Sequence, residues 1–259
     1  MRSIDLPNLG LIEYTLTEEQ LNHVYSLIKK GSPDGYEWEA NEITKINELR
    51  QQWGLLDEKN KFQKEILQPM VDTYLVKYGL PFLKNTTHQH GFTFQRWWAN
   101  VTTTGQYQAL HNHDSVFSFV LWVNIPYHTD DERAIKGQMR PETGDFMLLY
   151  QDILGRQRKR GIHLTPNDNG KIVLFPSQLM HAVYPHFTTD KPRISVAGDI
   201  SISSHSVQGP INGQMIESQL SHLVDSDEKN RLLHLNSQEY IVKDREMKIQ
   251  HGITKFDTP

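Results

Sequence analysis

From Gly91 onward the apolar residues repeat at every second position, and this change of period constrains the fold more than any other feature of the chain. Residues 92–98 alternate in this way, and residues 116–125 form an almost continuous apolar run of the kind found in strands covered on both faces. Further strand-like segments follow at residues 145–150, 171–175 and 193–202. Turn-forming residues separate these segments and no helical pattern intervenes, which favours an antiparallel sandwich or barrel over a Rossmann fold.

Before Gly91 the pattern is helical. Residues 17–20, Thr-Glu-Glu-Gln, have the form of a capping box, and apolar residues then recur at helical spacing up to Gly31. A second helical pattern covers residues 57–78 and places aromatic and aliphatic side chains on one face, which we expect to pack on the sheet. Pro69 should kink or split this helix because proline lacks the backbone N–H.

The chain is therefore expected to be an α+β protein in three parts. Residues 1–90 form an N-terminal helical region packed on the core, and residues 91–204 form the β core. Residues 205–259 form a C-terminal region with a short helix at about 225–235 and a charged, polar arm with few large apolar residues.

Composition excludes several classes of function. The 259 residues include no cysteine, so any metal must be held by histidine, aspartate or glutamate. The net charge of -4 argues against a protein whose main function is to bind nucleic acid. No apolar run reaches the roughly 18 residues that a membrane span needs, and the N-terminus lacks the layout of a signal peptide. We expect a cytoplasmic protein with no nucleic-acid or membrane partner, and its oligomeric state stays open.

Two histidines, His111 and His113, stand just before the long apolar run. In an extended segment, residues two apart point to the same face, so these imidazoles form a natural half of a metal site. A pair of hydrogen-bonded loop histidines is the alternative. His181 follows about seventy residues later between two strand-like segments. Taken alone, it is more typical of a structural histidine than of a ligand.

Arg193 and Ser195 are again two residues apart, on one face of a predicted strand. A guanidinium group offers two parallel hydrogen bonds to a carboxylate, and a hydroxyl group adds one more. A buried arginine on an inward face needs an anion. This anion is either a protein carboxylate in a salt bridge or the carboxylate of a ligand.

Taken in order, these motifs resemble the double-stranded β-helix oxygenases that use Fe(II) and 2-oxoglutarate, closest to a group of predicted oxygenases from bacteria and marine phages. The matching motifs lie between residues 92 and 203: Gly105-Gln106-Tyr107, His111, Gly144-Asp145-Phe146, residues 170–177, His181 and Pro192-Arg193-Ile194-Ser195. The resemblance implies a jelly-roll core, with Fe(II) as cofactor and 2-oxoglutarate and O2 as co-substrates. It also implies that Arg193, helped by Ser195, holds the distal carboxylate of 2-oxoglutarate. The expected reaction couples decarboxylation of 2-oxoglutarate to oxidation of a small molecule or a protein side chain, most simply its hydroxylation.

One position departs from the pattern of that superfamily, whose metal ligands are His-x-Asp or His-x-Glu and a distant histidine. The resemblance makes His111 and His181 ligands, and His113 takes the place of the carboxylate. Asp114 follows at once, but strand alternation turns it away from the His111 face unless a bulge rotates it inward. We expect a three-histidine site and keep Asp114 as the reserve ligand.

Two other classes of function remain open. A cupin-like metal enzyme that does not use 2-oxoglutarate, such as a three-histidine dioxygenase or an isomerase, would not need Arg193. A non-catalytic jelly roll, such as a sugar-binding or virion module, would need neither a metal nor aligned histidines. Trp97, Trp98 and Trp122 are candidates for pocket walls, although large aromatic residues more often belong to the core.

Overall fold

The computed structural model describes residues 9–46, 51–79, 92–135 and 142–202. Residues 1–79 and 94–201 belong to one compact unit. A second unit, residues 80–93 and 202–259, lies almost wholly outside the described residues. The predicted C-terminal helix and polar arm also lie outside them, and the domain boundaries at residues 90 and 204 stay predictions.

The first helix forms where the capping box predicts it. Helix α1 spans Glu18–Gly31. The Thr17 hydroxyl accepts a hydrogen bond from the backbone N–H of Gln20, and the Gln20 side chain accepts one from the backbone N–H of Thr17. These two bonds satisfy donors that a helix N-terminus otherwise leaves unpaired.

The second helix is divided at the predicted proline. A π-helical segment, Gln63–Leu67, is followed directly by α2, Gln68–Lys77. Pro69 cannot donate to the regular hydrogen-bond ladder, so the ladder changes register there. The helix starts at Lys61, later than expected, because the Asp57 side chain accepts a hydrogen bond from the backbone of Phe62 at 2.8 Å.

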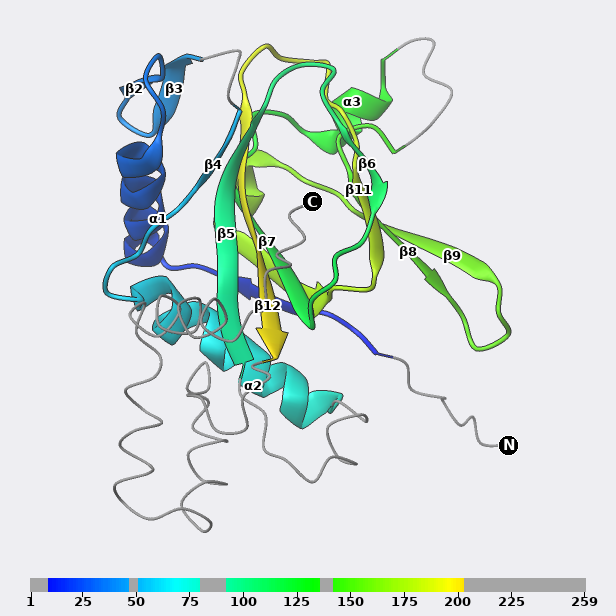
Figure 1. The fold of residues 1–259 in the computed structure, drawn as a ribbon. Helices are drawn as coiled ribbons and strands as arrows, with labels where there is room; N and C mark the ends of the chain where they lie inside the picture. The colour runs from blue at the N-terminus through cyan, green and yellow to red at the C-terminus, as the bar shows by residue number, and fades with distance from the viewer. Residues whose placement is uncertain (1–8, 47–50, 80–91, 136–141, 203–259) are drawn as a thin grey trace, which may run out of the picture. The chain divides into compact units, whose positions relative to one another are not determined.

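Two antiparallel sheets form the jelly-roll core. The larger sheet has the strand order β1-β10-β7-β12-β5-β4, and the smaller one has the order β6-β11-β8-β9. The strands of the larger sheet are β1 (Ile12–Thr15), β4 (Gln52–Gly54), β5 (Phe92–Thr102), β7 (Phe117–Asn124), β10 (Lys171–Pro176) and β12 (Arg193–Ile202). Those of the smaller sheet are β6 (Gln108–His111), β8 (Phe146–Gln151), β9 (Gln157–Ile162) and β11 (Met180–Val183). A separate hairpin of β2 (Glu37–Glu39) and β3 (Glu42–Lys45), the short helix α3 (Thr129–Arg133) and a 3-10 turn (Pro166–Asp168) complete the elements. Figure 1 shows β5, β12 and β7 running side by side.

The two faces of the larger sheet have different neighbours. Trp122 of β7 belongs to the buried apolar cluster between the sheets. Phe117 and Phe119, at alternate positions of the same strand, face the helices instead. The Phe119 ring lies 5.8 Å from that of Phe62, and the Phe117 ring lies 4.8 Å from that of Tyr74. The helical residues therefore cover the outer face and leave the inner face to the core and the site.

The prediction that the chain is helical before Gly91 is wrong for the stretches that form β1, β2, β3 and β4. Each has only three or four residues, too few to show a clear alternation. They become strands because a partner is available: Ile12 to Thr15 pair with Leu174 to Lys171 at the edge of β10.

In the part of the chain that the structure describes, no helix is long and apolar enough to cross a membrane. The cytoplasmic location and the absence of a nucleic-acid partner stay predictions.

Candidate active site

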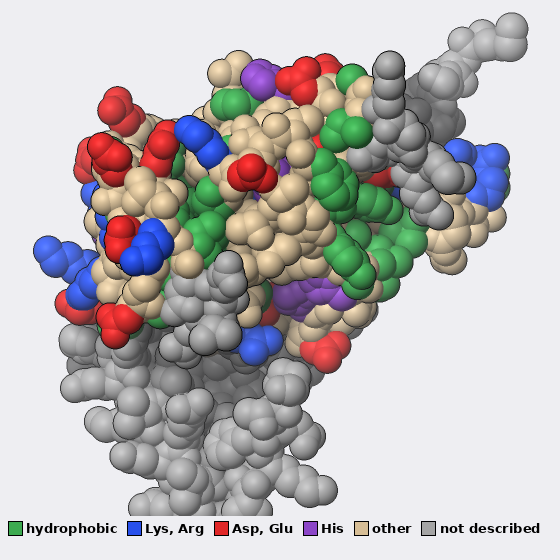
Figure 2. Space-filling model, turned by 90° about the horizontal axis from the view of Figure 1, so that it is seen from above, with side chains coloured by type: hydrophobic (Ala, Val, Ile, Leu, Met, Phe, Trp, Pro, Cys, Tyr) green, Lys and Arg blue, Asp and Glu red, His purple; other side chains and the backbone are tan. Residues whose placement is uncertain are grey.

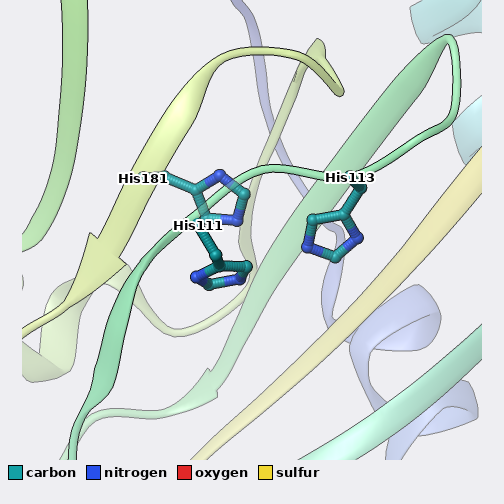
Figure 3. Close-up of side chains that lie close together, drawn as sticks. All are labelled: His111, His113 and His181. Carbon is teal, nitrogen blue, oxygen red and sulfur yellow. The ribbon is translucent and has the colours of Figure 1, made fainter. Parts of the chain in front are cut away.

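The smaller sheet brings two of the predicted histidines together. His111 is the last residue of β6 and pairs with His181 of β11 in antiparallel register. His113 lies in the loop that leads to β7, and its backbone N–H donates to the carbonyl of Ser177 at 2.9 Å. The ring centroids of the three histidines are 4.2 to 5.3 Å apart. Figure 3 shows the three side chains extending toward one another.

The three rings present one kind of atom to the space between them. In each ring Nδ1 lies at hydrogen-bond distance from an oxygen: the carbonyl of Ala109 for His111 (2.7 Å), Oδ1 of Asp199 for His113 (2.8 Å) and the carbonyl of Leu179 for His181 (2.9 Å). These oxygens only accept, so Nδ1 carries a proton in each ring, and in a neutral imidazole Nε2 is then the nitrogen that keeps its lone pair. One potential ligand atom from each ring lies within 4.8 Å of the others.

The protonation state of His181 suits metal coordination. Its side chain is 5% exposed, and burial lowers its pKa to about 4. The imidazole is therefore neutral at neutral pH, as a ligand must be. His111 and His113 are half-buried, and Figure 2 shows that histidine side chains reach the surface beside hydrophobic ones. Because His181 is buried and His111 and His113 are half-buried, the group has a buried side and a partly exposed side.

Asp199 lies behind His113 and was not predicted from the sequence. Its carboxylate is buried and also accepts a hydrogen bond from the Ser118 hydroxyl at 2.9 Å, while Nε of Arg96 lies 3.6 Å away. Burial acts to raise the pKa of Asp199, but the hydrogen bonds from His113 and Ser118 and the charge of Arg96 bring it below its ordinary value. The sequence held one indication of this role. Asp199 is an even number of residues after Arg193 and Ser195, so the three side chains lie on one face of β12.

Asp114, the reserve ligand, is exposed. Among the described residues, the group that could hold a metal contains His111, His113 and His181 only. The structure therefore brings together the three histidines and leaves Asp114 outside.

Arg193 is 2% exposed, and neutral groups hold its guanidinium. Nε donates to the Thr102 hydroxyl at 3.1 Å, and Nη1 donates to the Tyr127 hydroxyl and the Tyr184 carbonyl, both at 3.0 Å. Nη2 is buried and has no partner. None of the described carboxylates forms an ion pair with this guanidinium, so the salt-bridge alternative is not what the structure shows. A buried cation with a free donor is the feature that an anionic ligand would satisfy.

Ser195 lies on the same face as Arg193. It pairs with Trp122 of β7, whose side chain is in the cluster between the sheets, and directly paired residues share a face. The tryptophans divide between core and site. Trp97 stacks on Phe62 at 4.8 Å on the helical side, whereas Trp98 lies parallel to the ring of His113 at 6.2 Å.

A polar cavity of about 570 Å³ lies on the far side of Thr102, and its lining includes neither Arg193 nor the three histidines. Thr102, which accepts from Arg193, is part of its wall. Carboxamide side chains dominate the rest of the lining: Gln51, Gln52, Asn100, Gln106 and Gln108. The described residues that line it include no charged side chain. The cavity therefore offers neutral hydrogen-bond donors and acceptors.

Residues 96–199 match the model of a protein family described as "Putative 2OG-Fe(II) oxygenase". This match spans the histidine group, Asp199 and Arg193. No curated protein matches the chain.

Among solved structures, the chain is similar to an oxidoreductase of the 2OG-Fe(II) oxygenase family from Burkholderia pseudomallei, with 14% identity over 76% of this chain and 85% of that chain and a TM-score of 0.41. A Pseudomonas putida prolyl-4-hydroxylase shows 15% identity over 74% and 87%, with a TM-score of 0.40. A prolyl hydroxylase from Trichoplax adhaerens, solved in complex with a hypoxia inducible factor oxygen degradation domain peptide fragment, shows 14% identity over 75% and 83%, with a TM-score of 0.42. These structural similarities are weak, and the family match carries the comparison.

Proposed function

We propose that this chain is a member of the 2OG-Fe(II) oxygenases, whose family model residues 96–199 match, and that His111, His113 and His181 hold its iron while Arg193 holds its 2-oxoglutarate. The observation that carries the proposal is the orientation of the histidines. Each ring has Nδ1 engaged by an oxygen, which leaves three Nε2 atoms free to face one ion.

The donor set fits a first-row divalent metal. Imidazole nitrogen suits iron, and three ligands from one side leave positions open for a co-substrate and O2. When bound, iron couples the decarboxylation of 2-oxoglutarate to the oxidation of a substrate by O2, and this chemistry belongs to the cofactor. The chain's own contribution is to hold the ion and to orient what binds beside it.

Arg193 is suited to orient the dicarboxylate. Thr102 and Tyr127 accept hydrogen bonds from its guanidinium, and the Tyr127 hydroxyl in turn donates to the carbonyl of Gly144 at 2.8 Å. With Nε and Nη1 held in this way, Nη2 is left to bind a carboxylate oxygen. Ser195 adds a hydroxyl group on the same face. Because the guanidinium is buried, the charge-assisted bond would be little screened by water.

The rival functions fit these residues less well. A cupin-like enzyme that does not use 2-oxoglutarate would not require a buried arginine with a free hydrogen-bond donor. A non-catalytic jelly roll has no use for three converging imidazoles. The substrate of the proposed reaction is a small molecule or a protein side chain, to which the carboxamide-lined cavity beside Thr102 would offer neutral hydrogen-bond partners.

The test is an anaerobic titration of the purified protein with Fe(II) and then with 2-oxoglutarate. Chelation by 2-oxoglutarate should produce a metal-to-ligand charge-transfer band that saturates near one equivalent. Admission of O2 with candidate substrates should then yield succinate in step with oxidised product. Absence of the band at saturating iron and 2-oxoglutarate would exclude the proposed function.

A further inference from the structure

We infer that Asp199 is a positioning residue that supplies to the metal, through His113, the negative charge that a carboxylate ligand would otherwise bring. This inference rests on the proposed function, in which His113 is a ligand. In the superfamily pattern the residue at that place is itself an anion. Here the residue is a neutral imidazole, and the anion stands directly behind it.

The geometry of the pair is well defined. Oδ1 of Asp199 accepts from Nδ1 of His113 at 2.8 Å, and the Asp199 side chain is 3% exposed. Ser118 lies opposite Asp199 on the neighbouring strand β7, and its hydroxyl donates to the same oxygen at 2.9 Å. The Ser118 hydroxyl also lies 2.8 Å from that of Ser177, whose backbone carbonyl holds the His113 loop. The carboxylate is thus held in place by the same residues that anchor the loop.

The charge balance favours an effect on the metal. A carboxylate that accepts the Nδ1–H bond makes Nε2 a stronger donor and fixes the ring orientation, and loss of such a partner typically weakens metal binding about 10- to 100-fold. Arg96 is the cation nearest to the carboxylate in the described part of the chain. Its Nε is 3.6 Å from Oδ2, but its side chain is 62% exposed, so solvent screens it. Most of the negative charge therefore remains available to His113.

Two substitutions separate charge from orientation. Asp199→Asn keeps an oxygen that can accept from Nδ1 but removes the charge. Asp199→Ala removes both. We expect Fe(II) to bind about tenfold more weakly to the Asn variant and up to about 100-fold more weakly to the Ala variant. In the Asn variant the Fe(III)/Fe(II) reduction potential should rise, and the visible spectrum of the Co(II)-loaded protein should shift, because a purely structural role would leave both unchanged.

The chain offers a matched control in a second buried aspartate that pairs with a histidine. Oδ1 of Asp145 lies 2.9 Å from Nδ1 of His163, and the Asp145 side chain is 1% exposed, but neither residue belongs to the histidine group. Asp145→Asn should leave the metal affinity, potential and Co(II) spectrum as in the wild type. In addition, Asp199→Asn should cause no further loss of affinity in a His113→Ala background, because its effect passes through His113.

The outcomes separate this inference from the proposed function. If the wild type binds no Fe(II), the proposed function fails and this inference fails with it. If the wild type binds and the Asp199 variants match it in affinity, potential and spectrum, only the role of Asp199 is overturned. An equal loss in Asp145→Asn, or an undiminished effect of Asp199→Asn without His113, also overturns it. If the Asp199 variants do not fold, nitrogen NMR of the Zn(II)-loaded wild type decides: His113 should be protonated at Nδ1, and protonation at Nε2 overturns the inference.

Discussion

His111 and His181 stand opposite each other on β6 and β11, with their ring centroids 4.2 Å apart. The chain passes through β7, α3, β8, β9 and β10 before it returns to this point. Because paired strands fix the spacing of directly opposed side chains, these two imidazoles are held close before any ion binds. His113 joins them from a loop, so its position depends more on its own hydrogen bonds than on the sheet.

Substitution of His181 should abolish metal binding. His181→Ala removes the most buried member of the group and leaves two imidazoles, so Fe(II) affinity should fall by a large factor. The measurement is anaerobic equilibrium titration with folding checked by circular dichroism. His163→Ala, which removes a histidine outside the group, is the control. Wild-type affinity in folded His181→Ala would rule out the metal site as proposed.

Arg193→Ala should weaken 2-oxoglutarate binding without loss of iron. A charge-assisted hydrogen bond is worth about 1.5–3 kcal/mol, so affinity for 2-oxoglutarate should fall at least about tenfold. Arg193→Lys should restore only part of it, because an ammonium lacks the planar set of donors that bonds Thr102 and Tyr127 and still leaves Nη2 for the ligand. The readout is the charge-transfer band of the anaerobic iron complex as 2-oxoglutarate is added.

The control for Arg193 is Lys191→Ala, which removes an exposed positive charge two residues away. Its titration curve should match that of the wild type. An unchanged curve in well-folded Arg193→Ala would favour the cupin-like enzyme that does not use 2-oxoglutarate.

The identity of the third ligand can be tested by comparing neighbours. His113→Ala should weaken Fe(II) binding, whereas Asp114→Ala should not, because Asp114 is exposed and outside the histidine group. The two variants can be titrated side by side with Fe(II) under the same conditions. The reverse order of effects would make Asp114 the ligand.

The stability of the protein should fall in mild acid, in part through His186. This residue is fully buried, its Nε2 donates to the Lys191 carbonyl at 3.2 Å, and its ring stacks on Tyr127. Burial, and secondarily the charge of Arg193, lowers its pKa below the ordinary value of 6.5. The unfolded chain therefore binds more protons than the folded one as pH falls through that value, so the free energy of unfolding decreases there and is unaffected well above it.

His186→Phe keeps an aromatic ring on Tyr127 but cannot titrate. Thermal unfolding midpoints of the metal-free variant should therefore drop less between about pH 7 and about pH 5 than those of the wild type. Equal drops in both proteins would show that His186 does not contribute. His181, whose pKa is also lowered by burial, is present in both and cancels in the comparison.

The packing of the helical region on the outer face of the larger sheet should contribute strongly to the free energy of unfolding. Phe62 is 1% exposed and stacks on Trp97 at 4.8 Å. Phe62→Ala should reduce the free energy of unfolding by about 3–5 kcal/mol, the usual cost of emptying a large aromatic site. Val76→Ala on α2, where the side chain is 78% exposed, should change it by less than about 0.5 kcal/mol. Urea denaturation measures both.

The local pattern of apolar residues was sufficient to predict the strands that supply most of the buried core. The apolar run at 116–125 became β7, and the segment at 193–202 became β12 with the same bounds. His111 and His113 could be linked because they are two residues apart. Their link to His181 came from the resemblance, because nothing local says that β6 and β11 are partners.

Asp199 shows what local pattern cannot supply. In the sequence it is a single polar residue in a predicted strand, an even number of positions after Arg193. Its contact with His113 depends on the register between β12 and β7, where Asp199 lies opposite Ser118. The strands before Gly91 were missed for the same reason, because short segments take strand form only when a partner edge accepts them.

Strand β12 carries Arg193 near its start and Asp199 further along, on one face. A slip of one residue against β7 would turn both side chains out of the interior together. A single-residue insertion between Arg193 and Asp199 would instead give these two side chains opposite parity, so that only one of them could face the interior. An insertion in the preceding turn at residues 187–191 leaves the register of β12 intact. The tolerance of this protein to length changes should accordingly end abruptly at Arg193.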